Sequence, residues 1–113
     1  MTNGNGTNFS QTGGARIDSW NCTAPYAVLT AFRDALRLSC KDEYVFPKSN
    51  IVALTRIVAL TRHRSLFSVG LRIAHDVPLY PSLIAFWVSV VPGRKRFALL
   101  KERLEALGYE VDD

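Results

Sequence analysis

The first regular pattern of apolar and polar residues lies between positions 24 and 39. Apolar residues recur there at helical spacing and polar residues occupy the opposite side of a helical wheel. The apolar stripe consists of Val28, Leu29, Phe32, Ala35 and Leu36. Thr23 is a suitable N-cap, and Pro25 is tolerated in a first helical turn. The pattern predicts a helix over about 24–39, followed by a loop over 41–48.

A second helical pattern covers residues 94–107. Its apolar stripe consists of Phe97, Leu100, Leu104 and Leu107. Lys101 and Glu105 are four residues apart, a spacing that supports a helix, and Gly108 is a typical C-terminal stop. This segment is also predicted to be a helix.

Residues 51–56 and 57–62 are two identical hexads, Ile-Val-Ala-Leu-Thr-Arg. Six residues turn an α-helix by about 600°, so a helix would place equivalent residues about 240° apart. A strand would align the copies on one face, formed by Val52, Leu54, Arg56, Val58, Leu60 and Arg62. Ala, Leu and Arg favour helices, and a twelve-residue strand would be unusually long. The helix is therefore the preferred prediction, with a strand as the alternative.

The remaining segments are less regular. Residues 65–75 suit a helix that Gly70 weakens, although their alternation also suits a short strand. The apolar run 83–91 is compatible with a buried helix or a central strand, and residues 1–15 are polar enough to form a flexible arm. Together the patterns predict an all-α fold. It is a small bundle of four or five helices in one domain, 16–113, with a flexible N-terminal arm, 1–15, and possible short strands at 51–62 or 83–91.

Charge is segregated along the chain, whose net charge is +4 and pI about 9.4. From Tyr44 to His75 there is no Asp or Glu, while acids gather at the end as Glu110, Asp112 and Asp113. Separated positive charge indicates an anionic partner. The predicted nucleic-acid or anion-binding residues are Arg56, Arg62, His63, Arg64, Arg94, Lys95 and Arg96. The alternative is a solvated basic face whose partners are acids elsewhere in the fold.

No motif for catalysis, metal binding or a cofactor is recognisable, so the sequence predicts a protein that is not an enzyme. Cys22, Cys40, His63 and His75 match no zinc-site spacing. The apolar segment before Pro92 is too short for a transmembrane span. The first twelve residues lack the apolar core of a signal peptide, which favours a cytoplasmic protein. Reduced thiols are the default there, although Cys22 and Cys40 are compatible with one disulfide.

The leading functional hypothesis is a basic protein that self-assembles and binds RNA or DNA backbone without sequence preference, as a viral coat or nucleocapsid protein does. Leu99 points away from the apolar stripe of its helix and is the predicted contact of a homo-oligomer. The alternative is a protein–protein adaptor or regulator whose basic face binds an acidic partner. A membrane-surface protein is the third hypothesis.

Overall fold

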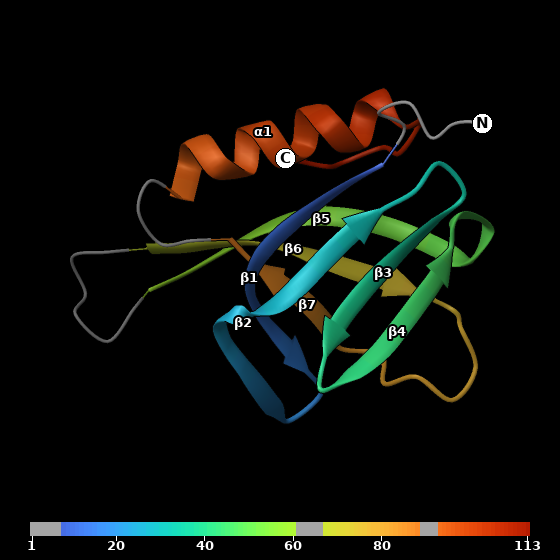
Figure 1. Cartoon of the computed structure of the whole chain (residues 1–113), viewed down its shortest axis with the longest axis horizontal. Coiled ribbons are helices and arrows are strands. Elements are labelled where there is room, and N and C mark those ends of the chain that lie inside the picture. Colours follow the sequence, from blue (N-terminus) through green and yellow to red (C-terminus); the bar gives the residue numbers. More distant parts are fainter. Residues whose placement is uncertain (1–7, 61–66, 89–92) are drawn as a thin grey trace.

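The computed structural model describes residues 8–60, 67–88 and 93–113. Within these ranges one seven-stranded antiparallel sheet curves into a half-barrel, and a helix packs on its concave side (Figure 1). The elements are β1 (Phe9–Ile17), β2 (Trp20–Ala31), β3 (Ala35–Cys40), β4 (Asp42–Pro47), the 3-10 turn η1 (Lys48–Asn50), β5 (Ile51–Leu60), β6 (Phe67–His75), β7 (Ile84–Trp87) and α1 (Gly93–Ala106). The strand order is β4-β3-β2-β1-β7-β6-β5. The predicted all-α fold is therefore wrong.

The predicted helix 24–39 is wrong because its apolar stripe is divided between strands β2 and β3, with Phe32 in the turn that joins them. Leu29 pairs with Leu38, and Ala31 pairs with Leu36. All four are fully buried, as period-two alternation in each strand requires. The chain reverses at Arg33 and Asp34, where the Phe32 N–H donates to the Ala35 carbonyl at 2.8 Å. The apolar residues of two strands joined by a short turn therefore have, along the sequence, a spacing that resembles that of a helix.

The described parts of the duplicated hexads and of the segment after them form the antiparallel pair β5, residues 51–60, and β6, residues 67–75. Leu54 pairs with Ile73, and Arg56 pairs with Leu71, so Leu54 and Arg56 share the concave face. The preferred helices are wrong for residues 51–60 and 67–75, where the strand alternative is right, while 61–66 lie outside the described residues. A repeat of six residues keeps each copy in phase in a strand, because six is a multiple of two.

Three further segments differ from their predictions or resolve an open choice. The predicted loop 41–48 contains strand β4. Phe9–Ala15, assigned to the flexible arm, belongs to β1, while residues 1–7 lie outside the described part. In the apolar run 83–91 the strand alternative is right for Ile84–Trp87, which form β7 between β1 and β6.

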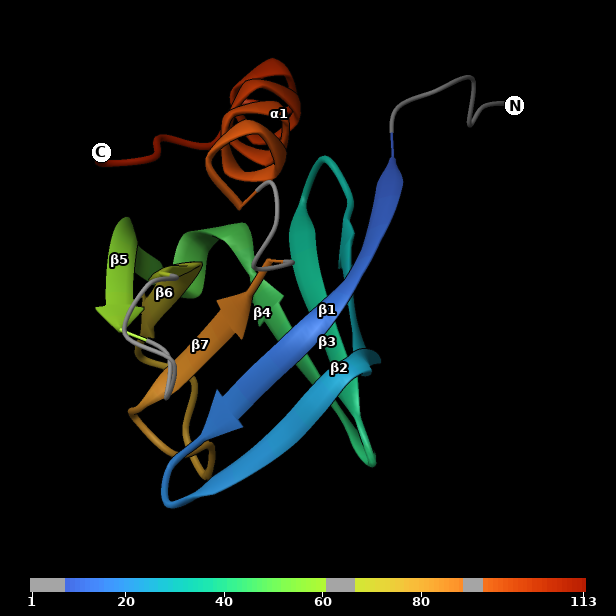
Figure 2. The same ribbon diagram turned by 90° about the vertical axis from the view of Figure 1, so that its left-hand side faces the viewer.

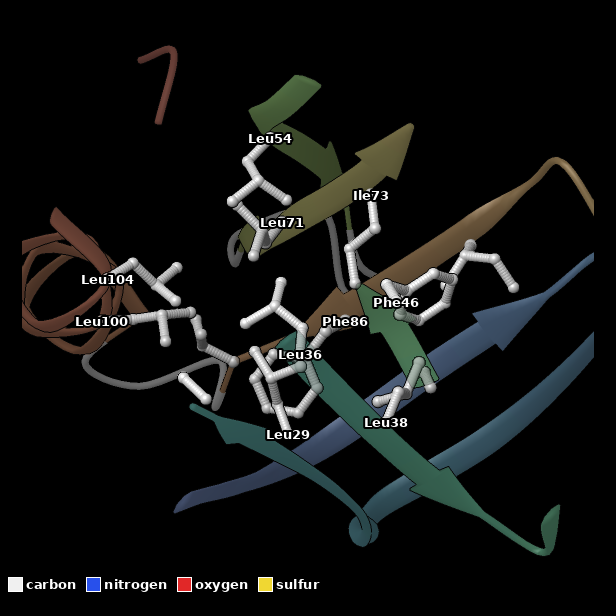
Figure 3. Packing of buried hydrophobic residues seen from close by; sticks show 14 of the residues in the cluster. Leu29, Leu36, Leu38, Phe46, Leu54, Leu71, Ile73, Phe86, Leu100 and Leu104 are labelled. Carbon is white, nitrogen blue, oxygen red and sulfur yellow. The ribbon is translucent and has the colours of Figure 1, made fainter. Parts of the chain in front are cut away.

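Helix α1 confirms the prediction for residues 94–107. It lies across the open side of the half-barrel (Figure 2) and directs Leu100 and Leu104 at the sheet. Both leucines are fully buried, as are Leu71 and Phe86 on the strands that face them (Figure 3). The main core thus lies between the concave face of the sheet and this helix.

Cys22 and Cys40 form a disulfide that joins β2 to β3, with 6.2 Å between their Cα atoms. The default expectation of reduced thiols does not describe this pair. Within the described ranges no helix combines the length and apolar character that crossing a membrane requires.

Candidate functional site at the edge of strand β5

Strand β5 is an edge strand of the sheet. Part of its free edge is paired with residues near the end of the chain. After α1 the chain turns back and runs between the helix and β5 (Figure 1). We call Tyr109–Asp113 the C-terminal strap. The Arg56 N–H donates to the Asp112 carbonyl at 2.8 Å, and the Asp112 N–H donates to the Leu54 carbonyl at 2.8 Å. The strap is thus a minimal parallel strand added at Thr55.

Tyr109 anchors the start of the strap. Its side chain is 5% exposed, and its hydroxyl donates to the Phe32 carbonyl at 2.7 Å. The Lys48 ammonium lies 4.4 Å from the ring centroid and donates to the Leu107 carbonyl at 2.7 Å. Burial, and secondarily the Asp34 carboxylate, raise the pKa of the Tyr109 phenol far above its usual range, so it remains a hydrogen-bond donor. Sequence reasoning placed Phe32 in a helical core, whereas its carbonyl receives this anchor.

Asp113 holds the other end of the strap by charge. Its carboxylate lies 3.1 Å from Arg56 Nε and 3.2 Å from Lys101 Nζ. The three side chains are between 28% and 49% exposed, so each ion pair contributes at most about 1 kcal/mol. The strap is therefore firmly anchored at Tyr109 and weakly held at Asp113.

The edge of β5 extends past the strap in both directions. A cleft lies between residues 51–54 of β5 and residues 108–110 before the bridge. In the other direction, period-two geometry turns the Arg56 carbonyl and the Val58 N–H outward, and neither has a backbone partner within the described residues. Val52 and Val58, 69% and 48% exposed, flank the bridge. The edge can accommodate a longer extended segment than the strap that now occupies it.

The structure separates the residues that the sequence grouped as an anion-binding set. Arg56 lies at the strap, whereas Lys95 and Arg96 are exposed in the first turn of α1. The backbone of Arg94 belongs to that turn, but its side chain lies outside the described part, as do Arg62, His63 and Arg64 altogether. Arg56 forms an ion pair with Asp113, an acid elsewhere in the fold, and anion binding by Arg56 stays a prediction.

The sequence assigned roles to two residues of helix α1, Lys101 and Leu99. Lys101 was paired with Glu105 on its own helix, but its ammonium is directed at Asp113. The sequence signal near this site was the run of acids after Gly108, opposite in sign to the window that contains Arg56, and it concerns the Arg56–Asp113 pair rather than Lys101. Leu99, predicted as an oligomer contact, is 47% exposed and lines a second cleft together with Phe9, Ser10, Gln11, Arg96 and Arg103.

The β5 edge combines several groups that can contact a ligand. It offers backbone donors and acceptors, an apolar seat for Val111, and two cations around one carboxylate. No cluster of metal-ligating side chains occurs within the described residues. In sequence comparisons no protein-family model matches the chain, and no curated protein is significantly similar to it.

Proposed function

We propose that this protein is a non-enzymatic interaction domain that binds an extended acidic segment of a partner protein by strand addition at β5. The observation that supports the proposal is the strap itself, whose contacts with β5 are those that an external segment would replace. An extended backbone bonds to Leu54 and Arg56, and a carboxylate lies between Arg56 and Lys101. This is the acidic-partner adaptor hypothesis, now attached to a defined edge.

The alternation of donor and acceptor along β5 favours a polypeptide as the ligand. Leu54 presents a carbonyl and Arg56 an N–H, and an added strand satisfies both with its own amide groups. A phosphate could contact Arg56 and Lys101, but a phosphodiester linkage has no N–H to donate to the Leu54 carbonyl. Charge-assisted bonds from the two cations then select segments that carry Asp or Glu at the position of Asp113.

The strap acts in this proposal as an internal competitor. Releasing residues 111–113 costs one pair of backbone hydrogen bonds, two partly exposed ion pairs and the contact of Val111. Net contributions of about 1 kcal/mol for each hydrogen bond, less for each ion pair and about 2 kcal/mol for buried Val111 are offset by about 1 kcal/mol of conformational entropy regained for each released residue, which puts the opening near 1–3 kcal/mol. An external segment would then bind about 5- to 150-fold more weakly than to an empty edge. Partner binding is therefore expected to become tighter when the strap is loosened.

The test uses the full chain with the double change Asp112→Pro and Asp113→Ser. Proline removes the N–H that bonds Leu54, and serine removes both ion pairs. The probe is a labelled peptide, Glu-Val-Asp-Asp followed by alternating Val and Thr, measured by fluorescence anisotropy. The loosened variant is expected to bind it at least fivefold more tightly than the unchanged chain. The matched control, Glu102→Ser with Glu105→Ser, makes the same charge change on exposed positions of α1.

A second pair of variants identifies the edge. Arg56→Glu in the loosened background should abolish peptide binding, whereas Arg33→Glu, which changes the charge equally in the β2–β3 turn, should not. A peptide with Lys in place of each Asp should not bind. The proposal is wrong if the loosened chain, folded by circular dichroism, does not bind the acidic peptide, or if both control variants behave like the test variants.

A further inference from the structure

The convex face of the sheet, opposite α1, carries two arginines in a single cross-strand row. Arg16 of β1 and Arg72 of β6 both pair with Ala85 of β7, which lies between them. Their neighbours in the chain, Ala15 and Leu71, pair with Phe86 and belong to the buried face. Because side chains alternate between faces, Arg16, Ala85 and Arg72 all point to the convex side. Two strand spacings separate the two arginine backbones by about 10 Å.

Neither arginine is neutralised within the protein. All ten acidic residues of the sequence lie in the described ranges, and none forms an ion pair with Arg16 or Arg72. Arg16 uses one N–H to donate to the Asp18 carbonyl at 3.0 Å, which leaves four donors. Both side chains are exposed, while Ala85 between them is only 2% exposed. Two charged guanidinium groups are thus presented to solvent on either side of a covered strand.

The next row on the same face holds an aromatic ring between two glycines. Trp87 pairs with Gly14 on one side and Gly70 on the other. A Cβ added to Gly70 would lie 2.6 Å from Trp87 Cε3 and 3.0 Å from Cδ2, so the indole rests directly on the Gly70 backbone. Trp87 remains partly exposed. Trp87 is two residues from Ala85, so its row lies about 7 Å along the strand from the arginine row.

We infer that this convex face binds single-stranded nucleic acid, with Arg16 and Arg72 on phosphates and Trp87 stacked on a base. Guanidinium groups bind phosphate oxygens through paired N–H donors. Any base can stack on an indole, so the contact needs no particular sequence. None of the outward positions in these two rows is acidic: they are Gly14, Arg16, Asn21, Thr55, Ile57, Gly70, Arg72, Ala85 and Trp87. The charge of these two rows is complementary to a phosphate backbone.

This inference concerns a different face from the β5 edge and does not depend on the proposed function. It returns to the nucleic-acid hypothesis, but with other residues. Arg16 and Trp87 were not selected from the charge pattern, and Arg72 lies within the acid-free window but was not among the predicted binding residues. A peptide would gain little here, because every strand in the row is already paired on both sides except β5. A single strand is favoured over a duplex, because only an unpaired base can stack on Trp87.

The first experiment measures anisotropy of a labelled oligouridine with the full chain over a range of salt concentrations. The variant Arg16→Gln with Arg72→Gln is expected to reduce the slope of log K against log salt by about 1.4, since each single-strand phosphate contact contributes about 0.7. The matched control is Arg33→Gln with Lys41→Gln, which removes the same charge from turns at the ends of β3 and should leave the slope unchanged. Equal losses in both variants, or no binding by the unchanged chain at low salt, overturns the inference.

The second experiment tests the aromatic contact. With Trp20 changed to Phe, Trp87 is the sole tryptophan, and oligouridine should quench its fluorescence. Trp87→Leu keeps an apolar group on Gly70 but removes the ring, and is expected to weaken binding about 5- to 150-fold while the circular dichroism spectrum is retained. Trp87→Phe should recover part of that loss. Unchanged affinity in Trp87→Leu, or loss only in Lys95→Gln with Arg96→Gln, places the RNA elsewhere and contradicts the inference.

Discussion

Tyr109 is the single residue that ties the strap to the opposite half of the sheet. Its hydroxyl reaches the Phe32 carbonyl in the β2–β3 turn, seventy-seven residues away in sequence. Tyr109→Phe should keep the packing and lose this hydrogen bond, which lowers the free energy of unfolding by about 1–2 kcal/mol because a partly buried carbonyl is left without its donor. Denaturant unfolding at neutral pH measures the difference.

The same residue gives the protein a specific alkaline dependence. In the unfolded chain a tyrosine titrates near pH 10, whereas burial raises the pKa of folded Tyr109 above that value. The stabilisation is therefore complete below about pH 10 and declines as the pH rises further, because the unfolded chain loses a proton that the folded chain keeps. Stability should fall less steeply above pH 10 in Tyr109→Phe than in the unchanged protein. Parallel slopes in the two proteins would contradict the raised pKa.

Gly70 illustrates how one position changes meaning between sequence and structure. In the sequence it weakened a predicted helix, whereas in β6 it is the seat of the Trp87 indole. Gly70→Ala should destabilise the fold by about 1–3 kcal/mol, because the new methyl group overlaps the ring. Adding Trp87→Leu should recover part of the loss, since a smaller side chain relieves the overlap. Thermal melts of the single and double variants would show additive losses if the ring did not lie there.

Among the elements, β2 and β3 are joined covalently as well as by their hydrogen bonds. The disulfide between Cys22 and Cys40 closes a loop of 18 residues. Cross-links of that length stabilise a fold by about 3 kcal/mol, chiefly by restricting the unfolded chain. A reducing agent should lower the denaturation midpoint of the unchanged protein to that of a Cys22→Ala, Cys40→Ala variant, and should not affect the variant. An unchanged midpoint on reduction would show that the two thiols do not pair in solution.

The sequence predicted helix or strand correctly only where the spacing of apolar residues fitted a single period. Helix α1 has a long stripe through Leu100 and Leu104, a stop at Gly108 and no strong β-forming run, so its prediction is right. The helix prediction for residues 24–39 failed because the turn residues are Arg33 and Asp34. Neither is a glycine or an asparagine, the residues that usually indicate a hairpin turn. Residues 51–62 failed because the helix propensity of Ala, Leu and Arg was weighed above strand pairing, which only the partner strand β6 supplies.

At the scale of the whole molecule, charges that are far apart in the sequence meet across the fold. The segregation of acids and bases predicted an external anionic partner for the window around Arg56, whereas the contact observed for Arg56 is an ion pair with Asp113 of the same chain. The sequence could not pair these residues, because their meeting depends on α1 returning the chain to the β5 edge. Nor could it identify the row of Arg16, Ala85 and Arg72, since that row exists only once the register of β1, β7 and β6 is fixed.

Self-association is the remaining prediction at this scale, and Leu99 is the residue that tests it. Leu99 lies beside Arg96 and Arg103 at a cleft that β1 closes with Phe9. If two copies bury this leucine, the chain should exceed its monomer mass in multi-angle light scattering, and Leu99→Glu should return it to 12.6 kDa by placing a charge in an apolar contact. Ala106→Glu, at the exposed last residue of α1, is the matched control. If the unchanged chain, Leu99→Glu and Ala106→Glu are all monomers, the homo-oligomer prediction is wrong. The β5 edge would then act in a single copy of the chain.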